Sequence, residues 1–133
     1  MKELTDKIRE ARFVFVCGNG GSSATAEHLT NDLFSRGVKA ICLSSNTSII
    51  TMIGNDFGYP HIFSRQLNIL ANDEDLLITI SCSGTSRNIV NAINVARDIR
   101  METYQFETFK NNKDFESLED KHMQLVHKIK KAL

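Results

Sequence analysis

Two short loops rich in glycine and serine carry the residue types best suited to hold an anion. The first, Cys17 to Ser23, follows an apolar run and precedes a helical pattern that starts at Ala24. Glycines let the backbone turn sharply and bring its N–H groups close to a ligand, and the following helix points the positive end of its dipole to the same place. The second loop, Ser81 to Ser86, also lies between an apolar run and a helical pattern. Two hydroxyl-rich helix N-termini are therefore expected to converge on one anion, such as a phosphate group.

Two better-known phosphate motifs do not fit the first loop. No lysine follows its glycines, as a nucleotide P-loop requires, and Gly18, Gly20 and Gly21 do not have the dinucleotide spacing G-x-G-x-x-G. Taken alone, one such loop could also be a tight strand-to-helix turn with helix-capping serines. The second, similar loop favours the anion-binding interpretation.

Helices and strands are expected to alternate along the chain. Strands are predicted at 13–17, 39–43, 76–80 and 103–107, and helices up to about residue 11, at 23–36, 48–54, 60–70 and 87–99, and after a loop at 108–116. Strands separated by helices imply right-handed crossovers and a parallel sheet covered on both faces. The predicted fold is a single α/β domain, 1–133, with a doubly wound parallel sheet in a three-layer αβα sandwich. Both loops then lie at strand carboxyl ends, where such sheets bind ligands.

Composition excludes several classes of function. The chain has 133 residues, 41% of them hydrophobic, with sixteen basic and sixteen acidic residues. This balance predicts no nucleic-acid partner and no polybasic membrane anchor. No stretch has the ~18 apolar residues of a membrane span, and the charged start lacks the apolar core of a signal peptide, so we expect a cytoplasmic protein without a membrane partner. The three cysteines have no C-x-x-C spacing, which favours reduced thiols.

An ordered set of motifs resembles the phosphoheptose isomerases, which belong to the sugar isomerase (SIS) domain proteins. The resemblance covers residues 12 to 100 well and the last helix moderately, and its motifs are Gly18-Asn19-Gly20-Gly21-Ser22, Gly54 to Tyr59, Ile62 to Gln66, Ile80 to Ser86, and Glu119 to His122 with His127. It implies a flavodoxin-like SIS fold and an aldose–ketose isomerase that converts sedoheptulose 7-phosphate to D-glycero-D-manno-heptose 7-phosphate through an enediolate. It also implies one zinc ion per site and a homo-oligomer, a tetramer or a dimer.

The resemblance also assigns roles to particular residues. It implies that Asp32 and His127 are catalytic. The implied metal ligands are His28, Asp32, Glu119 and His127. The implied substrate-binding residues are Asn19, Gly20, Gly21, Ser22, Asn55, Asp56, Ser81, Cys82, Ser83, Ser86 and Glu119. Moving a hydrogen between C1 and C2 of a sugar requires a base at carbon, an acid at oxygen and stabilisation of an enediolate, which suits these residue types.

Some of these residues have simpler interpretations, and some depart from the family pattern. His28 and Asp32 share a helix face at i, i+4, a spacing also common in solvated surface pairs, and Asp56 could simply end a helix. Asp32 stands where the family has Glu, and Cys82 and Glu119 replace Thr and Gln. The N-terminal helix is expected to be short and one strand to be missing. These departures leave an alternative: a non-catalytic module that binds a phosphosugar or a protein partner.

The last helix leads to a prediction about assembly. Glu119 and His127 are eight residues apart, which is ~12 Å along one helix and too far for one metal ion. Either the helix begins after Glu119 or a neighbouring subunit supplies His127, and we favour the shared site. The helix also carries a broad apolar surface, suited to an oligomeric bundle or to a core helix with an apolar flank. Its apolar residues are Leu118, Met123, Leu125, Val126, Ile129 and Leu133.

Overall fold

Four parallel strands form the centre of the fold. In this computed structural model, which describes residues 1–111 and 113–133, the strands lie in the order β2-β1-β3-β4. Their bounds are Val14–Gly18 for β1, Ala40–Cys42 for β2, Leu76–Ile80 for β3 and Glu102–Gln105 for β4. All three neighbouring pairs are parallel, and β1 and β3 are in register from Val14 opposite Leu76 to Gly18 opposite Ile80.

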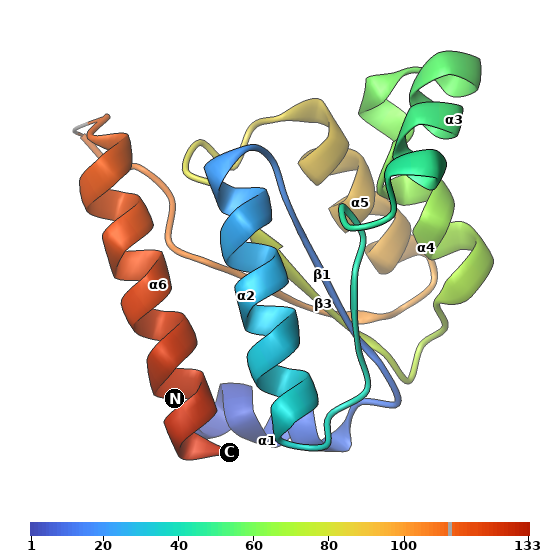
Figure 1. Ribbon diagram of the computed structural model, residues 1–133. Coiled ribbons are helices and arrows are strands. Elements are labelled where there is room, and N and C mark those ends of the chain that lie inside the picture. The colour runs from blue at the N-terminus through green and yellow to red at the C-terminus, as the bar shows by residue number, and fades with distance from the viewer. Residues whose placement is uncertain (112) are drawn as a thin grey trace.

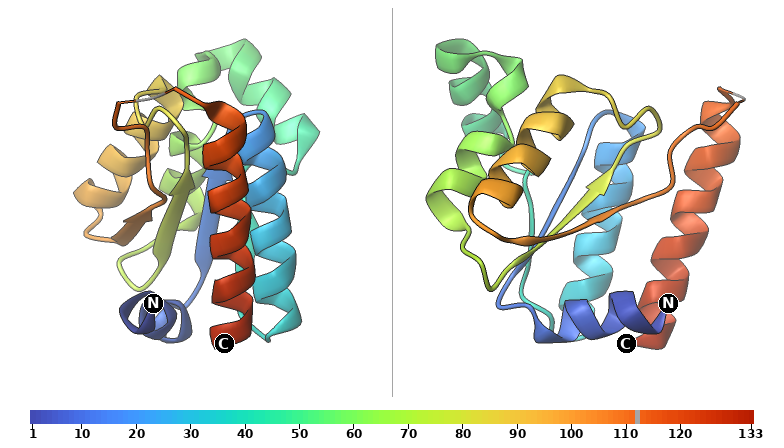
Figure 2. Two further views of the ribbon diagram at one scale, coloured as in Figure 1. Left: turned by 90° about the vertical axis from the view of Figure 1, so that its left-hand side faces the viewer. Right: turned by 180° about the vertical axis from the view of Figure 1, so that it is seen from behind.

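Helices cover both faces of this sheet, as the views in Figure 1 and Figure 2 show. One layer contains α1 (Lys2–Glu10), α2 (Gly21–Ser35) and α6 (Phe115–Ala132). The other contains α3 (Thr47–Phe57), the 3₁₀ turn η1 (Tyr59–His61), α4 (Ser64–Leu70) and α5 (Arg87–Asp98). The fold is therefore the predicted doubly wound αβα sandwich.

Alternation along β1 shows why both faces are apolar. Val14 and Val16 pack in the core under α2 and α6, while Phe15 and Cys17 pack in the core under α4 and α5. All five residues of β1 and all five of β3 are buried, as expected for central strands of a parallel sheet.

The predicted elements are confirmed, with changes at their ends. The helix predicted at 60–70 is divided into η1 and α4, and the helix predicted at 48–54 continues to Phe57. Gly58, at φ +98°, ends α3 in a conformation that favours glycine. No helix among the described residues is long and apolar enough to cross a membrane.

The arrangement of α2 and α6 decides the geometry of the site. The two helices lie side by side and run in the same direction, so their N-terminal ends are both near the carboxyl ends of β1 and β3 (Figure 1, Figure 2). α6 begins at Phe115 with Asp114 as its N-cap, whose side chain accepts a hydrogen bond from the Ser117 amide. Glu119 therefore lies inside a continuous helix, and the predicted alternative in which the helix begins after Glu119 is wrong.

Candidate functional site

The two serine-rich loops leave the sheet side by side. β1 and β3 are neighbours, and the chain crosses to opposite faces of the sheet after them, through α2 and α5 respectively. This is the point in a doubly wound sheet where a crevice forms at the strand carboxyl ends. Because Gly18 and Ile80 are paired in register, the two loops begin at the same level.

Glycines make the first loop tight. A Cβ at Gly18 would lie 2.5 Å from the Ser22 carbonyl oxygen and 2.8 Å from that of Ile80, so only glycine fits between the loop and β3. Gly20, the N-cap of α2, has φ +56°, in the left-handed region. A Cβ at Gly21 would lie 2.8 Å from Glu119 Oε1. The loop backbone therefore comes very close to its surroundings.

Hydroxyls in the second loop are held by the loop's own amides. Ser81 Oγ accepts a hydrogen bond of 3.0 Å from the Gly84 amide, and Ser83 Oγ accepts one of 3.2 Å from the Thr85 amide. Each hydroxyl keeps its own proton for donation to another group. The Ser86 hydroxyl, at the N-cap of α5, makes no capping hydrogen bond among the described residues. Three hydroxyl donors are thus presented at one helix N-terminus.

The two loops line one pocket of about 130 Å³ together with the start of α6. Predicted substrate-binding residues make up most of its wall: Asn19, Ser22, Ser81, Cys82, Ser83, Ser86 and Glu119, joined by Phe115. The structure therefore brings together these seven predicted residues, with Gly20 and Gly21 in the backbone beside them.

Two residues that the sequence did not assign hold Asn19 in place. The side-chain amides of Asn19 and Asn88 exchange hydrogen bonds of 2.8 and 2.9 Å. The Tyr59 hydroxyl donates to Asn19 Oδ1 at 3.3 Å. Tyr59 and Asn88 also line an adjoining pocket of about 290 Å³ that shares Asn19 and Ser86 with the first. Tyr59 lies within a quoted motif, but nothing in the sequence marks Asn88, which pairs across 69 residues.

Cys82 lies in the pocket wall, where the charge of the Glu119 carboxylate affects the pKa of its thiol. Burial raises the pKa of the Cys82 thiol, the negative charge of Glu119 raises it further, and a hydrogen bond with Ser22 lowers it. All three cysteines are free and buried.

A second cluster lies between α2 and α6, further along both helices. His28 Nε2 is 3.4 Å from Asp32 Oδ2, and the His28 and His127 rings meet edge to face with centroids 5.4 Å apart. Lys130 Nζ donates a 2.7 Å hydrogen bond to Asp32 Oδ1. The Asp32 side chain is 2% exposed, whereas that of Lys130 is 40% exposed. His28, Asp32 and His127, three of the four predicted metal ligands, are thus neighbours. Lys130, which was not predicted, lies in the same cluster.

Glu119 is separate from this cluster. It lies against Gly21 at the start of α2, whereas His28 is seven residues further along that helix. Over the described residues, 1–111 and 113–133, no group of three or more His, Cys, Asp or Glu side chains could hold a metal ion. The predicted four-ligand set is therefore not gathered at one point within one chain.

His127 lies beside His28 of its own chain, with the two rings packed edge to face. Glu119 lies apart from this pair, so a site completed by a neighbouring subunit stays a prediction. The apolar residues of α6 are also used within the chain: Leu118, Val126 and Ile129 are buried, and Met123, Leu125 and Leu133 pack against the core. This is the core helix with an apolar flank that the sequence left as the alternative.

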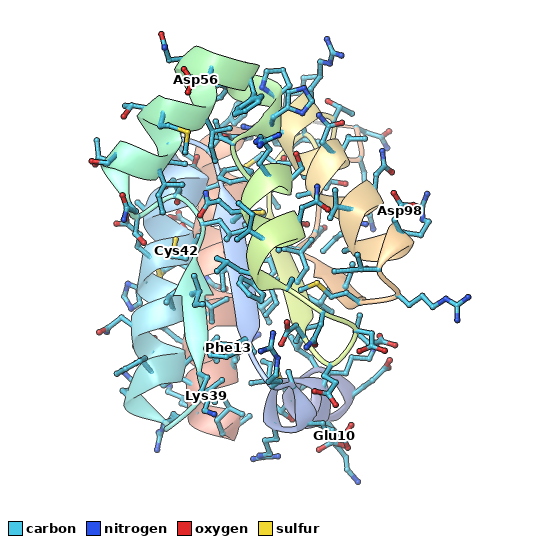
Figure 3. The ribbon with its side chains drawn as sticks, turned by 90° about the vertical axis from the view of Figure 1, so that its right-hand side faces the viewer. Glu10, Phe13, Lys39, Cys42, Asp56 and Asp98 are labelled. Atoms are coloured by element: carbon cyan, nitrogen blue, oxygen red, sulfur yellow. The ribbon has the colours of Figure 1, made fainter. Side chains whose placement is uncertain are left out.

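Asn55 and Asp56 are the predicted substrate-binding residues that lie away from the pocket. Both are exposed on the last turn of α3, and Asn55 Nδ2 donates to Asp56 Oδ1 at 3.0 Å. Figure 3 shows Asp56 at the outer end of that helix. Neither residue lines the pocket between the serine loops.

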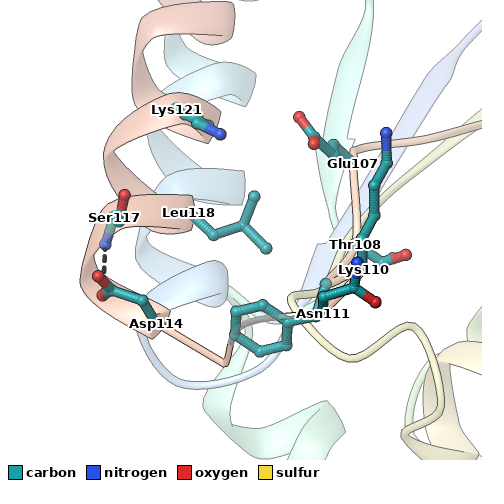
Figure 4. A pocket seen from close by; sticks show the side chains of 9 residues that line it. Glu107, Thr108, Lys110, Asn111, Asp114, Ser117, Leu118 and Lys121 are labelled. Atoms are coloured by element: carbon teal, nitrogen blue, oxygen red, sulfur yellow. Dashed lines mark hydrogen bonds between the residues drawn. The ribbon is translucent and has the colours of Figure 1, made fainter.

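Another pocket, of about 330 Å³, lies between the segment after β4 and α6 (Figure 4). Lys110, Asp114 and Leu118 are among its lining residues, and it contains none of the predicted site residues. His122, from the last motif, lies in the core instead: it packs against the Phe106 ring, and its Nε2 is 2.7 Å from the Glu107 carbonyl oxygen. Although this pocket is larger, we place the candidate site at the serine loops, because their hydroxyl groups can bind an anion.

Comparison with known proteins identifies the family. Residues 1–106 match the family described as the SIS domain. The chain belongs to the SIS-domain family. A phosphoheptose isomerase of Aliarcobacter butzleri is 43% identical over 108 residues, which cover 77% of this chain and 57% of that protein. One of Helicobacter pylori is 45% identical over 106 residues, which cover 75% of this chain and 55% of that protein.

The structural comparison extends the match to α6. The phosphoheptose isomerase GmhA of Neisseria gonorrhoeae superposes with a TM-score of 0.91 at 26% identity, covering 98% of this chain and 80% of that one. The SIS domain described here nevertheless spans about half the length of the curated relatives it matches.

Proposed function

We propose that this SIS domain is an aldose–ketose isomerase that converts sedoheptulose 7-phosphate to D-glycero-D-manno-heptose 7-phosphate. The observation that carries the proposal is the pocket in which Ser22 meets Ser81, Ser83 and Ser86 beside a carboxylate, Glu119. Relatives named phosphoheptose isomerase, at 43% and 45% identity, support the choice of sugar.

The phosphate group binds between the two loops in this proposal. The serine hydroxyls donate hydrogen bonds to it, and the N-termini of α2 and α5 add favourable dipoles. Glu119 lies at the same end of α2 and accepts hydrogen bonds from sugar hydroxyls. Because the negative charge of Glu119 would repel a phosphate group in close contact, the proposal places the phosphate against the serine hydroxyls and the sugar against Glu119.

The reacting carbons then lie near the second cluster. His28 is seven residues beyond Gly21, or ~10 Å along α2, and a seven-carbon sugar held by its terminal phosphate extends in that direction. His28 and His127 are exposed and can transfer protons at C1, C2 and their oxygens. Asp32, which the resemblance makes catalytic, is buried and acts through His28, whose Nε2 it faces at 3.4 Å.

Nuclear magnetic resonance of the protein with sedoheptulose 7-phosphate tests this proposal. We expect resonances of the aldose to appear with wild type and to appear much more slowly with His127→Ala. Binding of the sugar without conversion would instead favour a non-catalytic phosphosugar-binding module, and absence of binding would contradict the whole proposal.

We also propose that the protein self-associates, because several large apolar side chains face solvent in the single chain. Phe34 is 71% exposed and Ile69 is 76% exposed, and both project from helices on the outside of the sandwich. Light scattering, which measures the mass of the assembly, distinguishes such an interface from single exposed apolar residues of the kind common on monomers.

A further inference from the structure

The Asp32 carboxylate already has a cation bound to it. Lys130 Nζ lies 2.7 Å from Oδ1, a short charge-assisted hydrogen bond between residues 98 positions apart. Lys130 reaches Asp32 because α2 and α6 run side by side, and because Lys130 is three residues after His127 on the same face of α6. The ammonium group therefore belongs to the same cluster as the two imidazoles.

A divalent metal ion does not fit this cluster well. A tetrahedral zinc site needs four donors about 2 Å from one point, and a water can be the fourth beside three side chains, so the charge on Asp32 decides whether the ion fits here. Glu119 is away at Gly21, and Asp32 offers only Oδ2, the oxygen without a hydrogen-bond partner among the described residues. An ion on Oδ2 would lie next to the positive charge on Oδ1, and like charges at such a distance repel strongly in a partly buried site.

We propose that Lys130 is the resident cation of this cluster and takes the place of a zinc ion between α2 and α6. Its ammonium neutralises Asp32 and supplies the fixed positive charge at this end of the site. The inference does not depend on the isomerase activity, because it concerns metal binding. It makes the protein independent of zinc and makes Lys130 the residue that excludes the metal.

Calorimetric titration with zinc chloride at neutral pH tests the proposal. We expect wild type to show no one-to-one binding that depends on His28. Lys130→Gln removes the charge and keeps an N–H donor for Asp32, so it should gain one zinc site. Changes next to metal ligands alter affinity by about 10–100-fold, and we expect a gain of this order. Lys128→Gln, an equal change at an exposed position on α6, should show no gain.

Adding His28→Ala to Lys130→Gln should abolish the gain, which locates the new site in the cluster. Circular dichroism checks that each variant is folded, and His28→Ala in wild type provides a comparison that leaves the Asp32 bond intact. One zinc ion bound by wild type and lost in His28→Ala would overturn the proposal. So would a folded Lys130→Gln variant without any gain, since Lys130 would then not be the group that excludes zinc.

Discussion

The serine hydroxyls differ in how each is held, and this affects how each could contact the proposed phosphate group. Ser81 and Ser83 accept bonds from loop amides, while Ser86 makes no capping bond among the described residues. Ser83→Ala with Ser86→Ala should therefore weaken binding of phosphosugar by more than the ~1 kcal/mol of one neutral hydrogen bond. Calorimetry with sedoheptulose 7-phosphate measures this, and Ser48→Ala, on exposed α3, is the matched control. Unchanged affinity in the double variant would show that the phosphate group does not bind at these loops.

Gly18 is the residue at which the loop is least tolerant of a side chain. Its Cβ would meet backbone oxygen atoms at 2.5 and 2.8 Å, so Gly18→Ala should lower the free energy of unfolding by about 1–3 kcal/mol through overpacking. Gly54→Ala is a useful contrast, because nothing lies within 4 Å of its Cβ position and the residue is helical. It should be neutral or stabilise by about 0.5–1 kcal/mol. Urea denaturation compares the two, and equal stability would contradict the close approach.

Cys82 reports on the charge in the pocket. Burial and then the Glu119 charge raise the pKa of its thiol, and Ser22 lowers it. A raised pKa means less thiolate at pH 8, so alkylation should be slow in wild type, faster in Glu119→Gln and slower in Ser22→Ala. Cys17, fully buried and with its pKa raised further by burial, should stay unmodified. Peptide mapping after iodoacetamide treatment at several pH values measures each rate. A Glu119→Gln variant that reacts no faster would show that the Glu119 charge does not raise the pKa of the Cys82 thiol.

At the scale of elements, one buried carboxylate joins the starts of β1 and β3. Asp75 accepts hydrogen bonds from the Arg12 guanidinium at 2.7 and 3.0 Å and from the amides of Phe13 and Asn72 at 2.9 and 2.8 Å. The bond to Asp75 raises the pKa of Arg12.

Asp75→Ala should destabilise the protein by about 1–3 kcal/mol, because it leaves the partly buried amides of Phe13 and Asn72 without their acceptor. Asp73→Ala, two residues away and exposed, should change stability by less than ~0.5 kcal/mol. Thermal unfolding of the two variants compares them. A small effect of Asp75→Ala would show that water replaces the carboxylate.

Elements were easier to predict than the contacts between them. The apolar runs of β1 and β3 and the loops after them are visible in the sequence, because strand burial and glycine-serine turns have local patterns. The division of the 60–70 helix into η1 and α4 was missed because Pro60 fits the first turn of either kind of helix.

The Asp32–Lys130 bond could not be predicted at all. It joins residues 98 positions apart and depends on the parallel packing of α2 and α6. Spacing along α6 correctly separated Glu119 from His127. It could not show that His127 lies beside His28, because that contact also depends on the packing of α2 against α6.

At the scale of the whole molecule, the described chain leaves large apolar side chains in solvent on several helices. If these surfaces are covered by copies of the chain, light scattering at tens of micromolar should give a mass that is a multiple of 15.0 kDa. Ile69→Glu, at a side chain 76% exposed, should reduce the mass if α4 lies in an interface, because a charged group is costly to bury without a partner. Lys131→Glu, an exposed charged position on α6, is the control. A mass of one chain for wild type would contradict self-association.

We propose that the phosphate pocket and the histidine cluster together carry out an isomerisation through an enediolate. Incubation with sedoheptulose 7-phosphate in deuterium oxide, followed by nuclear magnetic resonance, tests it most directly, because a proton that leaves carbon for a base exchanges with solvent. We predict deuterium at the reacting carbon and formation of D-glycero-D-manno-heptose 7-phosphate, both lost in the Ser83→Ala, Ser86→Ala double variant. Tight binding of the sugar with no deuterium incorporation and no aldose would contradict the claim.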